Sequence, residues 1–82
     1  MHGTKQYDVI LDAREERCPM PLLKMKLALS KMDEDQLLCV LATDEGSRKD
    51  IPHYLSMVGV ELKESGTKPD GSFYFIVAKG GQ

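Results

Sequence analysis

The residues with the clearest chemical potential lie in the stretch Arg17-Cys18-Pro19-Met20-Pro21. Proline is favoured at the first position of a helix, so Pro19 in that position makes Cys18 the N-cap. Pro21 then falls at the third helical position, where a missing N–H costs no hydrogen bond within the helix. The two prolines therefore predict a thiol held rigidly at the start of a helix.

A helix N-terminus favours an anion at Cys18. The N–H groups of Met20 and Leu22 are the remaining donors, and the positive end of the helix dipole adds to their effect. A cysteine at such a position beside cations has its pKa lowered from about 8.5 to between about 3.5 and 7.5. We therefore expect Cys18 to be an accessible thiolate and a nucleophile at neutral pH.

Charged residues flank this cysteine on its N-terminal side. Arg17 is adjacent to Cys18 and Arg14 could reach it, whereas Glu15 and Glu16 carry the opposite charge and could cancel part of the effect. The alternative interpretation is that Cys18 is a small apolar residue buried in a tight corner between a strand and a helix. The prolines and arginines favour an exposed, rigid corner.

The other residues of the chain exclude several chemistries for this thiol. Cys39 lies in the apolar run LLCVLA and is predicted to be an inert core residue, so a second redox cysteine is missing. His2 and His53 are predicted to be solvated rather than to serve as a catalytic base. Two separated cysteines and two separated histidines lack the spacing of a structural zinc site, and we expect no metal or other cofactor. A lone activated thiol suits the acceptance and transfer of a sulfur atom.

Length and charge limit the class of protein. The chain has 82 residues, 41% of them hydrophobic, and a net charge of −2. It is long enough for one small core, so we expect a single domain over residues 1–82. The charge gives no field for direct binding of nucleic acid. The polar start and the lack of a long apolar run predict a cytoplasmic protein without a membrane segment, and we expect a monomer.

Hydrophobic patterning predicts four strands and two helices. In chain order, the predicted elements are a strand over 7–12, a helix from 19 to 32, a central strand over 36–43, a second helix that ends at Gly59, and two strands over 60–65 and 72–78. Ser47 and Asp50 are predicted to form a capping-box pair at the start of the second helix. The Pro-Asp-Gly turn before the last strand predicts a hairpin.

Details of these elements predict how they end and which faces they bury. The first helix is expected to bury Leu22, Met25, Leu29 and Met32, and the second Ile51, Leu55 and Val58. Asp35 is expected in the left-handed conformation after the first helix. Pro52 is expected to loosen the first turn of the second helix. In the first strand, Tyr7, Val9 and Leu11 are expected to share one face.

The order of elements predicts a two-layer α/β (α+β) sandwich with the order βαβαββ. Two helices can cover only one face of a four-stranded mixed sheet. Ile10, Tyr74 and Ile76 are therefore expected on an open face that is available to a partner.

Several stretches together resemble the TusA/SirA family of small sulfur carriers. They are LDAREERCPMPLLKMKLALSKM, LATDEGSRKDIP, VGVELKE and FYFIVAKGG, which cover roughly residues 8–81. The centre of the resemblance is the Cys-Pro-x-Pro motif at Cys18, Pro19, Met20 and Pro21, which stands at the junction of a strand and a helix. The resemblance implies the βαβαββ sandwich that the patterning also predicts.

The resemblance also implies a function. The cysteine that matches Cys18 receives sulfur as a persulfide from a cysteine desulfurase or another donor and passes it to an acceptor protein, in the manner of a sulfurtransferase-type carrier. The outlets of the family include tRNA thiolation, molybdenum-cofactor maturation and sulfur metabolism. Residues matching Arg17, Lys26, Asp44 and Lys49 lie in or near family motifs, and are candidates for binding a partner or stabilising the thiolate.

The chain departs from the family pattern close to the cysteine. Many members have glycine where this chain has Glu15, and an apolar residue often takes the place of Glu16. Met20 stands where some members, including the protein of the tRNA pathway, have an acidic residue. These differences leave the subfamily, and with it the choice of partner, open.

Two other classes of function compete with the sulfur carrier. The first is a non-catalytic interaction or regulatory domain, in which Cys18 is incidental and the open sheet face or a helix surface binds a partner. The second is RNA binding through the sheet aromatics Phe73, Tyr74 and Phe75. We expect these three to serve packing instead, since the net charge is negative.

Overall fold

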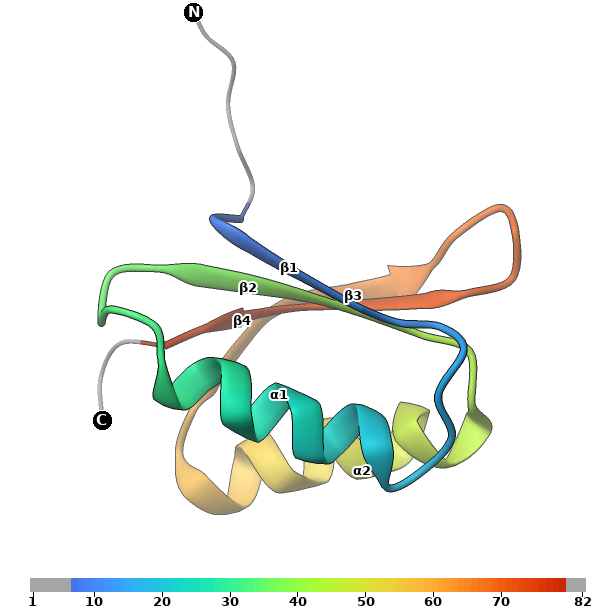
Figure 1. Cartoon of the computed structure of the whole chain (residues 1–82), viewed down its shortest axis with the longest axis horizontal. Coiled ribbons are helices and arrows are strands. Elements are labelled where there is room, and N and C mark those ends of the chain that lie inside the picture. Colours follow the sequence, from blue (N-terminus) through green and yellow to red (C-terminus); the bar gives the residue numbers. More distant parts are fainter. Residues whose placement is uncertain (1–6, 80–82) are drawn as a thin grey trace, which may run out of the picture.

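A computed structural model describes residues 7–79 of the chain; His2 therefore lies outside the described residues. The elements are β1 (Val9–Ala13), α1 (Met20–Ser30), β2 (Leu37–Ala42), α2 (Glu45–Val58), β3 (Glu61–Thr67) and β4 (Phe73–Ala78). Figure 1 shows the sheet as one layer and both helices as a second layer on one of its faces. The predicted βαβαββ two-layer sandwich is confirmed.

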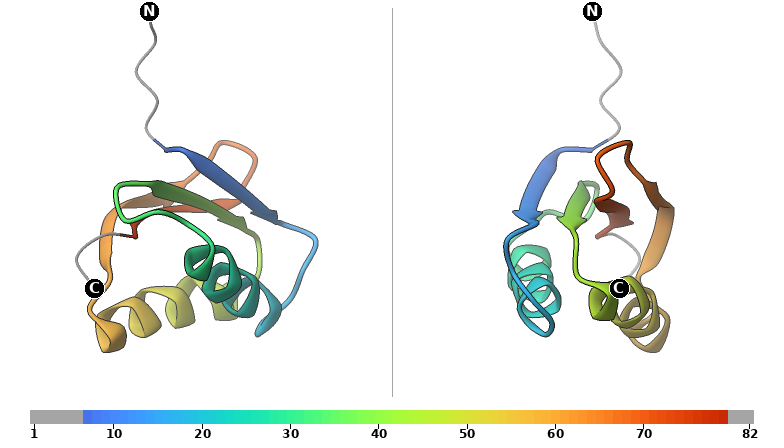
Figure 2. Two further views of the ribbon diagram at one scale, coloured as in Figure 1. Left: turned by 60° about the vertical axis from the view of Figure 1, so that its left-hand side comes forward. Right: turned by 90° about the vertical axis from the view of Figure 1, so that its right-hand side faces the viewer.

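The sheet is mixed, and its strands follow the order β1-β2-β4-β3. The strands β1 and β2 run parallel, whereas β4 is antiparallel to both of its neighbours, β2 and β3. The apolar strand β2 is thus an inner strand, as predicted, because a strand covered by neighbours and helices can be apolar at nearly every position. Both views in Figure 2 show the two helices on the same side of this sheet.

The core lies between the sheet and the helices. Its buried members are Met25, Leu29, Leu38, Val40, Ile51, Leu55, Phe73, Phe75 and Val77. Leu22 and Met32 pack at its margin, so the predicted apolar face of α1 is confirmed. The predicted face of α2 is confirmed at Ile51 and Leu55 but wrong at Val58, which is exposed.

The start of α1 differs from the prediction. Pro19 occupies the N-cap position and Met20 is the first helical residue, so Cys18 precedes the cap. The N–H of Met20 donates to the carbonyl of Arg17 over 2.7 Å, which closes a turn before the helix begins. The predicted left-handed residue after this helix is also wrong, because every described residue with a positive φ is a glycine and Asp35 is not among them.

The helix α2 begins earlier than predicted. Asp44 is the N-cap, and its side chain accepts a hydrogen bond from the N–H of Ser47 over 3.3 Å. Asp44 thus takes the capping role assigned to Ser47, and the predicted pairing of Ser47 with Asp50 is wrong. Pro52 lies inside a continuous helix rather than in a loose first turn. The predicted end at Gly59 is confirmed, since Gly59 is left-handed with a φ of 77°.

The face of the sheet turned away from the helices carries a second apolar cluster. Cys39, Leu41 and Ile76 are its buried members, with Tyr7, Leu37 and Tyr74 packed against them. Ile76 and Tyr74 lie on this face as predicted. Tyr7 also packs here, so its predicted place beside Val9 and Leu11 is wrong; it precedes the first residue of β1.

Cys39 is buried within this second cluster, with 4% of its surface exposed. Burial raises the pKa of its thiol, because an apolar environment disfavours the charged form. The prediction of a buried Cys39 is confirmed. No helix within residues 7–79 has the length and apolar character needed to cross a membrane.

Candidate functional site

Cys18 lies in the connection between β1 and α1, and it is exposed. The peptide bond that joins it to Pro19 is cis. Its Sγ donates a hydrogen bond to Oδ2 of Asp50 over 2.9 Å, and its backbone N–H donates to Oδ2 of Asp44 over 3.2 Å. Both acceptors belong to α2 or its cap. The thiol is therefore positioned by the second helix as well as by its own loop.

Gly46 allows this close approach. A Cβ at position 46 would lie 3.1 Å from the Cβ of Cys18 and 2.9 Å from Oδ2 of Asp44. A side chain there would push against both residues, since real Cβ atoms rarely come so near to other atoms. The first turn of α2 thus lies directly against the cysteine because it carries a glycine.

The charge of this site is opposite to the prediction. The hydrogen bond to Asp50 raises the pKa of the Cys18 thiol, and loss of water and the negative charges of Asp50 and Asp44 raise the pKa further. An anionic sulfur could not donate this hydrogen bond and would be repelled by both carboxylates. The predicted lowering of the Cys18 pKa is therefore wrong: in the free protein, these contacts favour the neutral form of the exposed thiol. Asp44 accordingly does not stabilise a thiolate.

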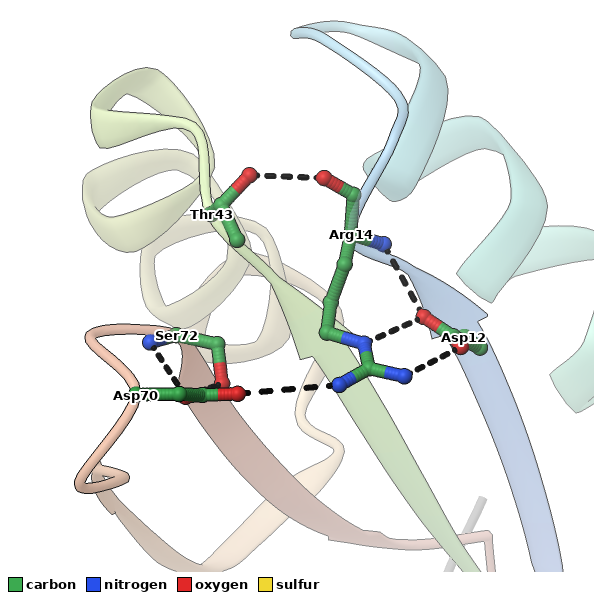
Figure 3. Close-up of polar contacts among 5 residues, drawn as sticks. All are labelled: Asp12, Arg14, Thr43, Asp70 and Ser72. Atoms are coloured by element: carbon green, nitrogen blue, oxygen red, sulfur yellow. Dashed lines mark hydrogen bonds and ion pairs between the residues drawn. The ribbon is translucent and has the colours of Figure 1, made fainter.

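Two of the groups that were expected to stabilise a thiolate, the N–H of Met20 and the Arg14 guanidinium, are engaged elsewhere. The N–H of Met20 is bonded to a backbone carbonyl. Arg14 forms two side-chain hydrogen bonds with Asp12, at 2.9 and 2.8 Å, and an ion pair of 3.7 Å with Asp70 (Figure 3). Thr43 donates to the carbonyl of Arg14 over 2.7 Å. Arg14 thus ties the start of the cysteine loop to the sheet and to the β3–β4 hairpin.

The pair formed by Arg14 and Asp12 gives a prediction about pH. The Arg14 guanidinium lowers the pKa of Asp12 to about 2. Because this pKa is lower in the folded state than its ordinary value of about 3.9, the pair adds stability above pH 4 that is lost as the pH falls through about 2. In Arg14→Gln, we expect an NMR titration of the Asp12 carboxyl to move up toward its ordinary midpoint.

The matched control is Arg17→Gln, which removes one arginine and leaves the pair in place. It should keep the midpoint of Asp12 near 2. An unchanged midpoint in Arg14→Gln would show that another group holds the carboxylate.

The two prolines of the motif differ in burial. Pro19 is exposed as the N-cap, whereas Pro21 is fully buried in the first turn of α1. Pro21 therefore anchors the start of the helix in the core, and Pro19 forms part of the surface around the thiol. The predicted support of Cys18 by both prolines stays a prediction.

The remaining predicted site residues do not reach the sulfur. Arg17 and Lys49 are exposed, and neither forms a hydrogen bond or ion pair with Cys18 within residues 7–79. Lys26 lies over the ring of Tyr54, 5.2 Å from its centroid. These cations are thus available to a partner's surface rather than to the thiol.

One acidic residue of the loop, Glu16, has a cationic partner. Glu16 accepts a hydrogen bond from Lys24 over 2.7 Å, which balances its charge. Asp50 and Gly46 lie against the cysteine, and neither was predicted to belong to the site. A glycine in the first turn of a helix signals the close approach of another segment, and this signal could have identified Gly46. Asp50 had no comparable signal.

The described part of the chain contains no group of three or more His, Cys, Asp or Glu side chains arranged to hold a metal ion. The site therefore presents one accessible thiol with two carboxylates beside it. A protonated thiol of this kind can exchange with another sulfur compound once its proton is removed.

Comparisons with known proteins identify the family. Residues 9–79 match the family model described as sulfurtransferase TusA. The sulfur carrier protein TusA of Allochromatium vinosum is 41% identical over 73 residues, which cover 89% of this chain and 95% of that protein. The sulfur carrier protein TusA of Pseudomonas aeruginosa is 34% identical over 76 residues, covering 93% and 96%.

A solved structure supports the fold. The crystal structure of a SirA-like protein from Desulfitobacterium hafniense superposes with a TM-score of 0.79 at 24% identity, over 90% of this chain and 100% of the other.

The family model spans most of the sequence, and the two relatives are matched over nearly their whole length. The chain therefore belongs to the TusA family.

Proposed function

We propose that this member of the TusA family carries sulfur on Cys18, as a persulfide that it accepts from a donor protein and passes to an acceptor. The observation that carries the proposal is the exposure of this one thiol: Cys18 is exposed, whereas Cys39 is buried. A sulfur-carrier role follows from membership of the family, which matches residues 9–79. The experiment below tests whether Cys18 is the residue that carries the sulfur.

The transfer is an exchange without net oxidation. Cys18 Sγ attacks the outer sulfur of the donor's persulfide, and the bond between the donor's two sulfurs breaks. The donor cysteine leaves as a thiolate and takes up the proton released by the Cys18 thiol. Cys18 then holds the sulfur as a persulfide anion until an acceptor thiol or an electrophilic carbon takes it.

The surface beside Cys18 supports docking of a protein partner. Three apolar side chains of α1, Met20, Leu23 and Leu27, are exposed. Their spacing of three and four residues puts them along one side of the helix, beginning two residues after the cysteine. Lys26 lies on the same helix and Arg17 lies just before it, and both are exposed. A partner with apolar and acidic residues would therefore fit this surface.

The donor and the acceptor are proposed only by class. A cysteine desulfurase is the expected donor, and the acceptor belongs to tRNA thiolation, molybdenum-cofactor maturation or sulfur metabolism. We expect the carrier to act in the cytoplasm as a monomer.

The experiment is to incubate the protein with a cysteine desulfurase and cysteine and to measure the intact mass without reductant. We expect the mass to increase by one sulfur atom and the added mass to disappear after treatment with a reductant. A protein that stays unmodified with several desulfurases and with a small-molecule persulfide would overturn the proposal and favour the interaction domain.

A further inference from the structure

The contact between Cys18 and Asp50 has a consequence for sulfur transfer. The thiol donates to a carboxylate oxygen at 2.9 Å, and the carboxylate can only accept. Asp50 is half-buried on α2, and the next residue, Ile51, is fully buried in the core. The packing of the helix therefore holds the backbone of Asp50 in place beside the cysteine.

The charges that face the sulfur from α2 and its N-cap are both negative. Asp44 accepts the backbone N–H of Cys18, and Asp50 accepts its thiol. On the cysteine's own loop, Glu16 is paired with Lys24, and Arg17 forms no ion pair within the described residues. The surroundings of the sulfur thus suit a group that donates a hydrogen bond and disfavour a negative charge.

The empty and loaded forms of the carrier differ in this respect. Empty Cys18 is a thiol and can donate to Asp50, whereas a persulfide anion has no proton to donate and adds a negative charge beside the two carboxylates. The contact is favourable in the empty form and repulsive in the loaded form. A residue that stabilises one of the two forms more than the other shifts the equilibrium between them.

We propose that Asp50 is a positioning residue that favours the protonated, sulfur-free form of Cys18, so that it promotes discharge of the carrier. This inference rests on the proposed function. In the discharge step, an acceptor thiolate attacks the outer sulfur of the Cys18 persulfide and the bond between Cys18 and that sulfur breaks. Cys18 leaves as a thiolate, takes up the proton that the acceptor thiol had released, and donates again to Asp50. Loading requires a donor that offsets the repulsion, which a lysine or arginine placed beside Asp50 would do.

The first test follows the rate of alkylation of Cys18 by iodoacetamide as a function of pH, in Cys39→Ser protein. In Asp50→Asn, we expect the midpoint to fall by about one unit, which raises the rate at neutral pH by about tenfold. Asp35→Asn is the matched control, because Asp35 is exposed and its side chain forms no hydrogen bond or ion pair within residues 7–79. Its midpoint should equal that of the parent. Equal midpoints in all three proteins would overturn the proposal.

The second test measures the exchange of sulfur with glutathione persulfide at a fixed ratio of persulfide to glutathione. The equilibrium constant for loading, taken from intact masses, should rise by about tenfold in Asp50→Asn and Asp50→Ala and stay unchanged in Asp35→Asn. Unchanged or weaker loading of both Asp50 variants would contradict the proposal. If the parent takes up no sulfur at all, the proposed function fails, and the alkylation midpoints still decide whether Asp50 controls the thiol.

Discussion

Replacement of Cys18 with serine is expected to abolish sulfur loading completely. A hydroxyl cannot form a persulfide, and the other thiol, Cys39, has only 4% of its surface exposed. A donor persulfide therefore has no second accessible thiol to reach. Serine is close in size to cysteine, and its hydroxyl can still donate to Asp50, so the variant should fold like the parent. The measurement is the intact mass after incubation with a desulfurase and cysteine.

The reciprocal variant, Cys39→Ser, is the control. It should gain one sulfur atom to the same extent as the parent, because it keeps the exposed thiol. A sulfur adduct that persists in Cys18→Ser and is lost in Cys39→Ser would move the carrier site to Cys39. Adducts of the same size on both single variants would show unspecific sulfuration of surface groups instead.

The fold could be predicted because its signals are local and mutually consistent. The alternation in β1, the nearly continuous apolar run in β2 and the helical spacing of Met25 and Leu29 each specify one element. The order of these elements then leaves few topologies, since parallel neighbours such as β1 and β2 need a crossover connection. The observed sheet order and the single layer of helices agree with this reasoning.

The helix starts could not be predicted because neighbouring residues compete for the same role. Asp44 and Ser47 are both good N-cap residues, and local sequence does not choose between them. In the structure, Asp44 also accepts the N–H of Cys18, a residue 26 positions away. This long-range bond favours Asp44 over Ser47 as the N-cap of α2. Because Asp50 then has no capping role, its side chain can accept the hydrogen bond of the thiol.

The charge at Cys18 was predicted wrongly for a related reason. A low pKa is expected from the helix N-terminus and from the neighbouring cations Arg14 and Arg17, with Glu15 and Glu16 opposing them. The carboxylates that contact the cysteine come from positions 26 and 32 residues further along the chain. Electrostatic effects depend on distance in space, so the sign of the field at the thiol is determined by the packing of α2. The exposure of the thiol, by contrast, agreed with the prediction from the motif.

The packing of α2 against the sheet can be tested through Leu55. This side chain is 1% exposed and belongs to the core between helix and sheet. Truncation to alanine leaves a cavity that the surroundings fill only in part, at a cost of about 2 to 5 kcal/mol. A domain of this size has a free energy of unfolding of roughly 4 to 12 kcal/mol. We expect Leu55→Ala to lose a large share of it, measured as a lower midpoint of urea unfolding with an unchanged slope.

Met57→Ala is the matched control on the same helix, since Met57 is 68% exposed. Its unfolding free energy should stay within about 0.5 kcal/mol of the parent. Because Asp50 lies on α2, a loosened helix should also weaken its contact with Cys18. Alkylation of Cys18 should therefore become faster in Leu55→Ala, under conditions where the variant is still folded, and stay the same in Met57→Ala. Equal stability of the two variants would mean that Leu55 does not hold α2 to the sheet. The position of Asp50 would then depend on the hydrogen bond between Asp44 and the N–H of Cys18.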